Sequence, residues 1–124
     1  MRGRAIVVSG GRARVVDAPS VSALVDKALG GWDSTDWVYA TRRDIRFFVS
    51  EGSQVGCPAS VLWCFEGRPW TLFRGTVVIA ANPRKPSQPG WRGLTRAEER
   101  FVLRSLRPGP DGIYTIYTGS GWES

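Results

Sequence analysis

The sequence contains no histidine. This absence excludes Ser-His-Asp and Cys-His catalysis, histidine general bases and zinc sites with histidine ligands. Cysteine is almost as scarce, because only Cys57 and Cys64 are present. Two thiolates do not complete the four-ligand set of a structural zinc site within one chain. The sequence therefore predicts neither a metal site nor a bound cofactor.

Long apolar runs are also missing. No run approaches the roughly 20 residues that span a bilayer, and the chain after Met1 lacks the apolar segment of a signal peptide. If Cys57 and Cys64 lay on one helix, their Cα atoms would sit about 10 Å apart, beyond the reach of a disulfide. We therefore expect reduced thiols, a cytoplasmic location and no membrane partner.

Lysine is rare, because the 17 basic residues are all arginine except Lys27 and Lys85. Only 11 acidic residues oppose them, so the formal net charge is +6. A positive field of this size favours acidic partners, nucleic acid first among them. Apolar residues, in contrast, are plentiful: 42% of the 124 residues are hydrophobic, including 6 Trp. This content predicts a single ordered domain over residues 1–124.

Turn and cap signals divide the first half of the chain. Gly10-Gly11 separates two β-rich runs, which predicts a hairpin because glycine adopts positive φ at both turn positions. Ser20 is expected to cap a helix whose apolar residues recur at helical spacing until Gly30. In chain order, the expected elements are strands over 4–9 and 12–16, a helix over 21–29, and paired strands over 37–40 and 45–49.

The middle of the chain predicts a short helix followed by a long strand. Val61, Leu62 and Phe65 fit one helical face, which predicts a helix over residues 59–65 that carries Trp63. The next segment, residues 72–81, is expected to be a strand. Its end is a continuous apolar run without polar alternation, which is typical of a central strand covered on both faces.

Thr95 and Glu98 form the signature of a capping box, so a second long helix is expected from there to about residue 106. Its inward-facing residues would be Leu94, Ala97, Phe101, Val102 and Leu106. A last strand is expected over 113–118, with a flexible loop at about 82–93 and a polar tail at 119–124. The predicted fold is α+β, with one mixed or antiparallel sheet of about five or six strands and about three helices.

Three strings in the middle of the chain resemble a family of small uncharacterised phage and plasmid proteins. They are Phe48-Val49-Ser50-Glu51-Gly52, Gly56-Cys57-Pro58-Ala59-Ser60 and Gly75-Thr76-Val77-Val78-Ile79. In that family a strand ends in an Asn-Glu-Glu-Gly-Lys-like turn, a Gly-Leu-Pro-x-Asn corner leads into a helix, and a Gly-(Asp/Thr)-Val-Val-Ile strand follows. The resemblance covers roughly residues 4–106. It implies a mobile-element accessory protein of α+β fold in an infected or carrier bacterial cell.

The strongest functional signal is a run of arginines in the late helix. Arg96, Arg100, Arg104 and Arg107 are spaced four, four and three residues apart, which stacks their guanidinium groups on one helix face. Four phosphate contacts would make the affinity for duplex DNA fall roughly 150-fold between about 50 and 200 mM salt. The structural alternative is a solvated face partly neutralised by Glu99.

The adjoining loop adds cations and an aromatic ring to this helix. Trp91 could stack on an unpaired base or, alternatively, hold the loop against the core. Together, the predicted nucleic-acid-binding residues are Arg84, Lys85, Trp91, Arg92, Arg96, Arg100, Arg104 and Arg107. A second basic cluster comprises Arg42, Arg43 and Arg46.

Two other classes of function remain open. Exposed tryptophan and arginine are typical anchors of protein interfaces, so the runner-up is a protein-binding modulator or inhibitor of a host or defence factor. Carboxylates could converge on Mg²⁺ as in a nuclease, the candidates being Asp33, Asp36, Asp44 and Glu51. Turn chemistry explains Asp33 and Asp36 more simply. The leading hypothesis is a small non-enzymatic protein that binds nucleic acid.

Overall fold

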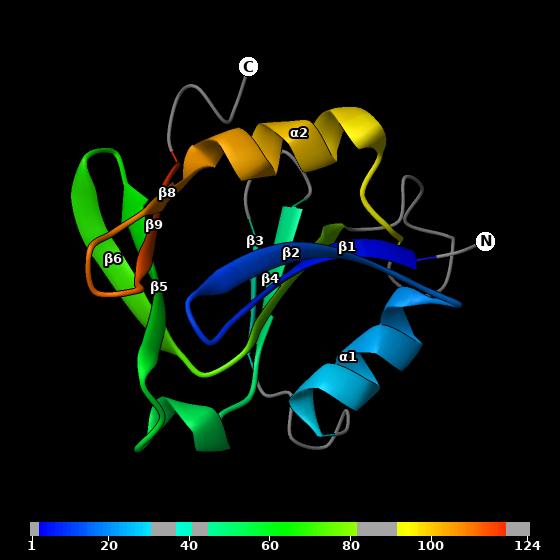
Figure 1. Cartoon of the computed structure of the whole chain (residues 1–124), viewed down its shortest axis with the longest axis horizontal. Helices are drawn as coiled ribbons and strands as arrows, with labels where there is room; N and C mark the ends of the chain where they lie inside the picture. The colour runs from blue at the N-terminus through cyan, green and yellow to red at the C-terminus, as the bar shows by residue number, and fades with distance from the viewer. Residues whose placement is uncertain (1–2, 31–36, 41–44, 82–91, 119–124) are drawn as a thin grey trace.

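The computed structural model describes residues 3–30, 37–40, 45–81 and 92–118, and these residues form an α+β fold (Figure 1). Within them are two sheets, of five and four strands, and two α-helices, where the sequence predicted one sheet of about five or six strands and about three helices. The elements are β1 (Gly3–Ser9), β2 (Arg12–Ala18), α1 (Val21–Leu29), β3 (Trp37–Ala40), β4 (Ile45–Val49), the 3₁₀ turn η2 (Gly52–Gln54), β5 (Ala59–Phe65), β6 (Arg68–Arg74), β7 (Val77–Ala81), α2 (Arg96–Ser105), β8 (Leu106–Pro108) and β9 (Tyr114–Thr118).

The first sheet has five antiparallel strands in the order β2-β1-β7-β4-β3. The predicted hairpin between β1 and β2 is confirmed, and its turn needs glycine because φ is +57° at Gly10 and +76° at Gly11. Strands β3 and β4 pair as predicted. All of β7 is buried at the centre of the sheet, as its continuous apolar run indicated.

Helix α1 covers one face of the five-stranded sheet, as Figure 1 shows. The hydroxyl of Ser20 accepts a hydrogen bond from the backbone N–H of Ala23 at 3.0 Å, so the predicted N-cap is confirmed. The helix ends at Gly30, where φ is +79°. Its buried residues pack against the sheet; they are Val21, Leu24, Val25 and Leu29 on the helix, and Val7, Phe48 and Val78 on the strands.

The second sheet has four strands in the order β6-β5-β9-β8, with β5 and β9 parallel. It packs against the other face of the five-stranded sheet, and aromatic rings fill the space between them. The ring of Phe47 lies 5.4 Å from that of Trp63 and 5.8 Å from that of Phe73, measured between centroids. The indole N–H of Trp63 donates to the hydroxyl oxygen of Thr118 at 2.7 Å, which satisfies the one polar group that this tryptophan brings into the core.

The helix predicted over residues 59–65 is wrong, because this segment is strand β5. Six of the seven residues are apolar or aromatic, and such a run fits a buried strand as well as one face of a short helix, so periodicity does not separate the two. The segment is a strand because it has hydrogen-bonded partners on both sides, β6 on one side and β9 on the other. Trp63 and Cys64 are buried in this strand.

The single strand predicted over residues 72–81 is also wrong. The chain turns at Gly75, where φ is +74°, and passes from β6 in one sheet to β7 in the other. A Cβ atom at Gly75 would lie 2.7 Å from the Cβ of Ser53, so no larger residue fits this corner without movement. The hydroxyl of Ser60 donates to the carbonyl oxygen of Gly75 at 2.6 Å and helps to hold the crossing between the sheets.

Candidate nucleic-acid interface

Helix α2 begins with the capping box that the sequence predicted. The hydroxyl of Thr95 accepts from the backbone N–H of Glu98 at 3.1 Å, and the Glu98 carboxylate accepts from the backbone N–H of Thr95 at 2.8 Å. The helix packs across the open end of the core between the sheets through Val102, with Leu94 and Leu106 buried at its two ends. Phe101 is half-buried, whereas Ala97, predicted to face inward, is exposed.

Glu98 forms a two-point ion pair with Arg92. The two guanidinium nitrogens Nη1 and Nη2 of Arg92 donate to the two carboxylate oxygens of Glu98 at 2.6 and 2.8 Å. Desolvation raises the pKa of Glu98, but the hydrogen bonds and charge of Arg92 and the bonds to Thr95 outweigh it and leave that pKa below its ordinary value. Arg92 also pairs with Ala81 through the backbone, so it belongs to the fixed framework rather than to the predicted loop of 82–93.

Glu99 forms a second ion pair, with Arg4 of β1. The Nη2 of Arg4 donates to Oε1 of Glu99 at 3.3 Å, and its Nε donates to the other carboxylate oxygen. The hydrogen bond and negative charge of Glu99 raise the pKa of Arg4. Glu99 therefore attaches α2 to the five-stranded sheet, and it does not neutralise the arginines of its own helix as the structural alternative supposed.

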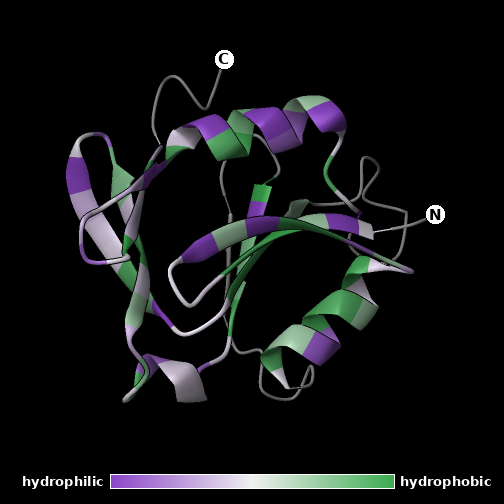
Figure 2. Ribbon diagram, viewed as in Figure 1, coloured by the Kyte–Doolittle hydropathy of each residue, from purple (hydrophilic) through white to green (hydrophobic). Residues whose placement is uncertain are grey.

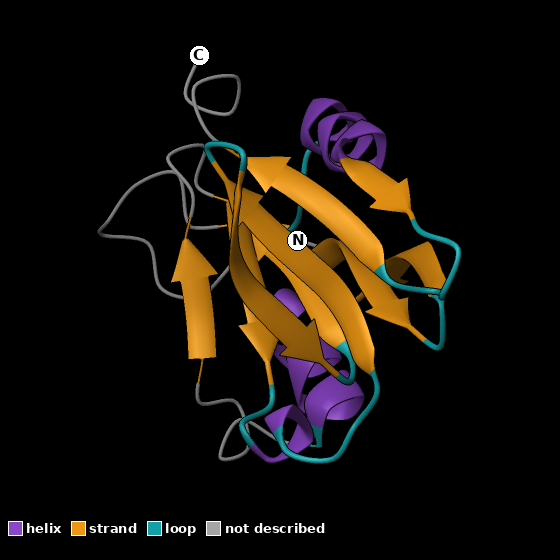
Figure 3. Cartoon of the chain, turned by 90° about the vertical axis from the view of Figure 1, so that its left-hand side faces the viewer, coloured by secondary structure: helices purple, strands orange, loops and turns teal. Residues whose placement is uncertain are grey.

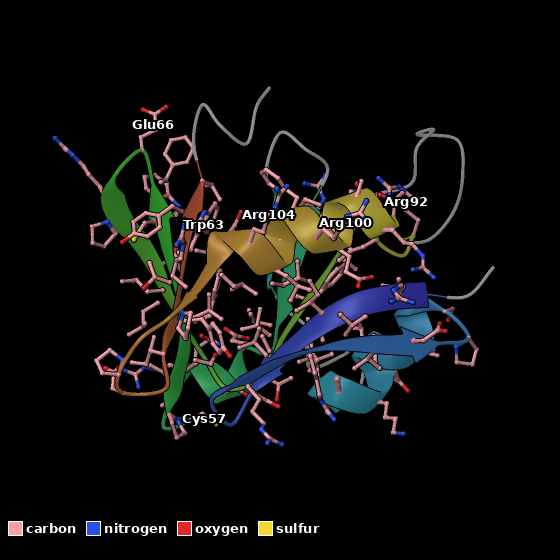
Figure 4. All side chains as sticks on the ribbon, turned by 45° about the horizontal axis from the view of Figure 1, so that its top comes forward. Cys57, Trp63, Glu66, Arg92, Arg100 and Arg104 are labelled. Atoms are coloured by element: carbon pink, nitrogen blue, oxygen red, sulfur yellow. The ribbon has the colours of Figure 1, made fainter. Side chains whose placement is uncertain are left out.

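Arg96, Arg100 and Arg104 are exposed along the outer side of α2. Figure 4 shows Arg100 and Arg104 on this helix, with Arg92 at the end where the helix begins, and Figure 2 shows purple segments along its length. Within the described part of the chain, none of the three makes a hydrogen bond or an ion pair. Because Glu98 and Glu99 are bound by Arg92 and Arg4, the outer side of α2 carries uncompensated positive charge.

Arg107 does not lie on the helix, contrary to the sequence-based prediction. Helix α2 ends at Ser105, and the backbone of Leu106 is extended, with φ −79° and ψ 114°. Arg107 lies in β8 and pairs in register with Thr115 of β9. It is exposed and follows the three helix arginines directly along the chain, so it extends the basic surface from the helix onto the four-stranded sheet.

The remaining predicted binding residues, Arg84, Lys85 and Trp91, lie outside the described residues. The same holds for Arg42 and Arg43 of the second basic cluster, while Arg46 is half-buried on β4. Of the eight predicted residues, the structure thus places Arg96, Arg100 and Arg104 on the outer side of α2 and Arg107 on β8, and it assigns Arg92 to an internal ion pair.

Comparison with known proteins identifies no relative. No protein family matches the chain, and no curated protein or solved structure is significantly similar to it. The site is therefore interpreted from its own geometry.

The carboxylates considered for Mg²⁺ do not form a site in the described residues. Asp33, Asp36 and Asp44 lie outside these residues, and Glu51 is exposed beside η2. In the described ranges, no three side chains of His, Cys, Asp or Glu come close enough to hold a metal ion.

Neither helix is long and apolar enough to cross a membrane, again for the described chain. Cys57 and Cys64 are free thiols, as expected, and burial raises the pKa of Cys64.

The sequence analysis missed Tyr117, which the four-stranded sheet exposes together with Trp70. Trp70 is 64% exposed and Tyr117 is 54% exposed. No sequence pattern had singled out Tyr117. The alternation of side chains along the strand over residues 114–118 could have indicated that Tyr117 is exposed. Ile116 is buried, and the next residue of a strand points to the opposite face.

Proposed function

We propose that this protein is a small non-enzymatic binding protein that contacts nucleic acid through Arg96, Arg100 and Arg104 of α2, with Arg107 of β8 extending the contact. In keeping with the resemblance to phage and plasmid proteins, we infer an accessory role in a mobile element, within the cytoplasm of a bacterial cell. That resemblance and that location stay predictions.

The observation that carries the proposal is the division of charge around α2. Two carboxylates at the start of the helix would otherwise offset the arginines, but each is held by an arginine from outside the helix. The three remaining guanidinium groups are exposed at intervals of about one helical turn. Planar guanidinium groups bind phosphate oxygens with two parallel hydrogen bonds, which makes such a face suited to a phosphate backbone.

The experiment compares two double variants that remove equal charge. Arg96→Gln with Arg100→Gln alters the proposed face, whereas Arg12→Gln with Arg14→Gln alters exposed arginines of β2. Binding of labelled DNA and RNA is followed by fluorescence anisotropy at several salt concentrations. We expect the α2 variant to weaken binding to all sequences alike and to reduce the salt slope on duplex DNA by about 0.9 for each phosphate that it no longer neutralises. The β2 variant should change binding much less.

Equal losses in the two variants would show that only net charge matters, and the α2 proposal would then be wrong. Absence of salt-dependent binding by the wild-type protein would also reject it. In that case, a partner recovered from bacterial lysate after nuclease treatment and high salt would favour the runner-up, a protein-binding modulator of a host or defence factor.

A further inference from the structure

One face of the four-stranded sheet is not covered by any helix of the described residues. Figure 3 looks onto this sheet, and no helix of the described residues lies in front of it. Its inner face carries Val61, Trp63 and Ile116, which belong to the core between the sheets. Side chains on the opposite side form what we call the outer sheet face: Leu72 of β6, Leu62 of β5, Thr115 of β9 and Arg107 of β8 in one row, and Tyr117 of β9 in the next.

The residues of this row are true neighbours, because each is the register partner of the next. Leu62 pairs with Leu72 on one side and with Thr115 on the other, and Thr115 pairs with Arg107. Partners in adjacent strands point to the same side of a sheet. A row of two leucines and a threonine therefore runs across the strands and ends at the exposed guanidinium group of Arg107.

The outer sheet face exposes apolar and aromatic side chains, and no helix in the described part of the chain covers them. Tyr117 is 54% exposed and Leu72 is 39% exposed. At the end of the β5–β6 hairpin, Trp70 is 64% exposed and contacts Phe65, with ring centroids 5.9 Å apart. Exposed apolar and aromatic side chains on one side of a sheet are typical of an interaction site.

The four strands of this sheet carry positive charge, which favours a negatively charged partner. Strands β5, β6, β8 and β9 contain no carboxylate, but they contain Arg68, Arg74 and Arg107. Glu66 lies in the turn at the tip of the β5–β6 hairpin, where Figure 4 shows it pointing away from the sheet. Arg107 of β8 follows Arg104, in the last turn of α2, with two residues between them in the chain. The outer sheet face thus favours an anionic ligand with flat apolar groups.

We propose that the outer sheet face binds single-stranded nucleic acid, with an unpaired base stacked on Tyr117 and the backbone following Arg107 towards the arginines of α2. This inference rests on the proposed function and adds a preference for single strands. A base inside a duplex does not offer its flat face to a protein ring, whereas an unpaired base does. A second copy of the chain is a poorer occupant, because it would bring Arg107 and its basic neighbours against the same positive surface.

The test uses a short oligothymidylate and a DNA duplex of equal length as probes for the whole chain. Tyr117→Leu keeps an apolar side chain but removes the ring, and Tyr117→Phe keeps the ring. We expect wild type and Tyr117→Phe to bind the single strand alike, and Tyr117→Leu to bind it at least about fivefold more weakly. The three proteins should have the same salt slope and the same duplex affinity, since no phosphate contact changes.

Three outcomes would overturn the inference. The first is an equal loss for single strand and duplex in Tyr117→Leu, and the second is no loss for either probe. The third is a concentration-dependent dimer in sedimentation that Tyr117→Leu abolishes, since the face would then be a contact between copies. In each case the salt-dependent contribution of Arg96 and Arg100 would still be measured by their own variants, so failure of the stacking site is distinguished from failure of the helix proposal. Circular dichroism checks that each variant is folded.

Discussion

The two sheets of this protein differ in how their faces are covered. Helix α1 covers one face of the five-stranded sheet, and the four-stranded sheet with α2 covers the other, so every residue of its central strand β7 is buried. The four-stranded sheet contributes only one face to the core and exposes Leu72 and Tyr117 on the other. Apolar side chains therefore stabilise the fold in the first sheet, while in the second a part of them is available for binding.

The strongest test of double coverage uses two adjacent residues of β4. Phe47 faces the core between the sheets and Phe48 faces α1, and both are fully buried. Phe47→Ala and Phe48→Ala should each lower the free energy of unfolding by about 3–5 kcal/mol, because each removes a large side chain and leaves a cavity. Urea denaturation followed by tryptophan fluorescence measures both. A loss below about 1 kcal/mol at Phe48 would show that α1 does not seal that face.

A smaller effect is expected from the ion pair that fixes the start of α2. The folded pKa of Glu98 is lowered, so its contribution to stability is present above its unfolded pKa and is lost as the pH falls through the folded value. We therefore expect the wild type to have a higher unfolding free energy than Glu98→Gln. This difference should be larger at about pH 7 than at about pH 3. Denaturation of both proteins across this range checks the sign. A difference that is constant with pH would contradict the role of the carboxylate charge.

The smallest effect is expected on the uncovered face. Leu72→Thr keeps a residue suited to a strand and changes a side chain that is already 39% exposed. Its unfolding free energy should stay within about 0.5 kcal/mol of wild type. Thermal and urea denaturation measure this together with the Phe47 variant. A loss approaching that of Phe47→Ala would mean that the outer face is covered in solution and would weaken the comparison between the sheets.

Much of the local structure was predictable because its signals lie within a few residues. The turn at Gly10-Gly11, the cap at Ser20 and the capping box of Thr95 with Glu98 each depend on near neighbours, and all are confirmed. The segment from Ala59 to Phe65 was predicted wrongly because its apolar spacing fits two structures. Its identity as a strand depends on β6 and β9, and β9 lies far along the chain.

In the candidate site, too, features that depend on near neighbours were predictable and features that depend on distant residues were not. The spacing of Arg96, Arg100 and Arg104 placed them on one exposed helix face, as found. The partner of Glu99 was not predictable, because Arg4 lies 95 positions away in the sequence. Arg107 was assigned to the helix because no local signal distinguishes a last helical turn from a strand that begins at Leu106.

The sequence by itself determined the charge, the lack of histidine chemistry, the caps, the first hairpin and the buried central strand, because composition and short-range hydrogen bonding set these properties. Only the tertiary structure decided that two sheets form, that Gly75 carries the chain from one to the other, and that no helix among the described residues covers the outer sheet face. The tertiary structure also decided that Glu98 and Glu99 pair with Arg92 and Arg4 and not with the arginines of α2. Strand pairing and ion pairs between distant residues depend on how the whole chain packs.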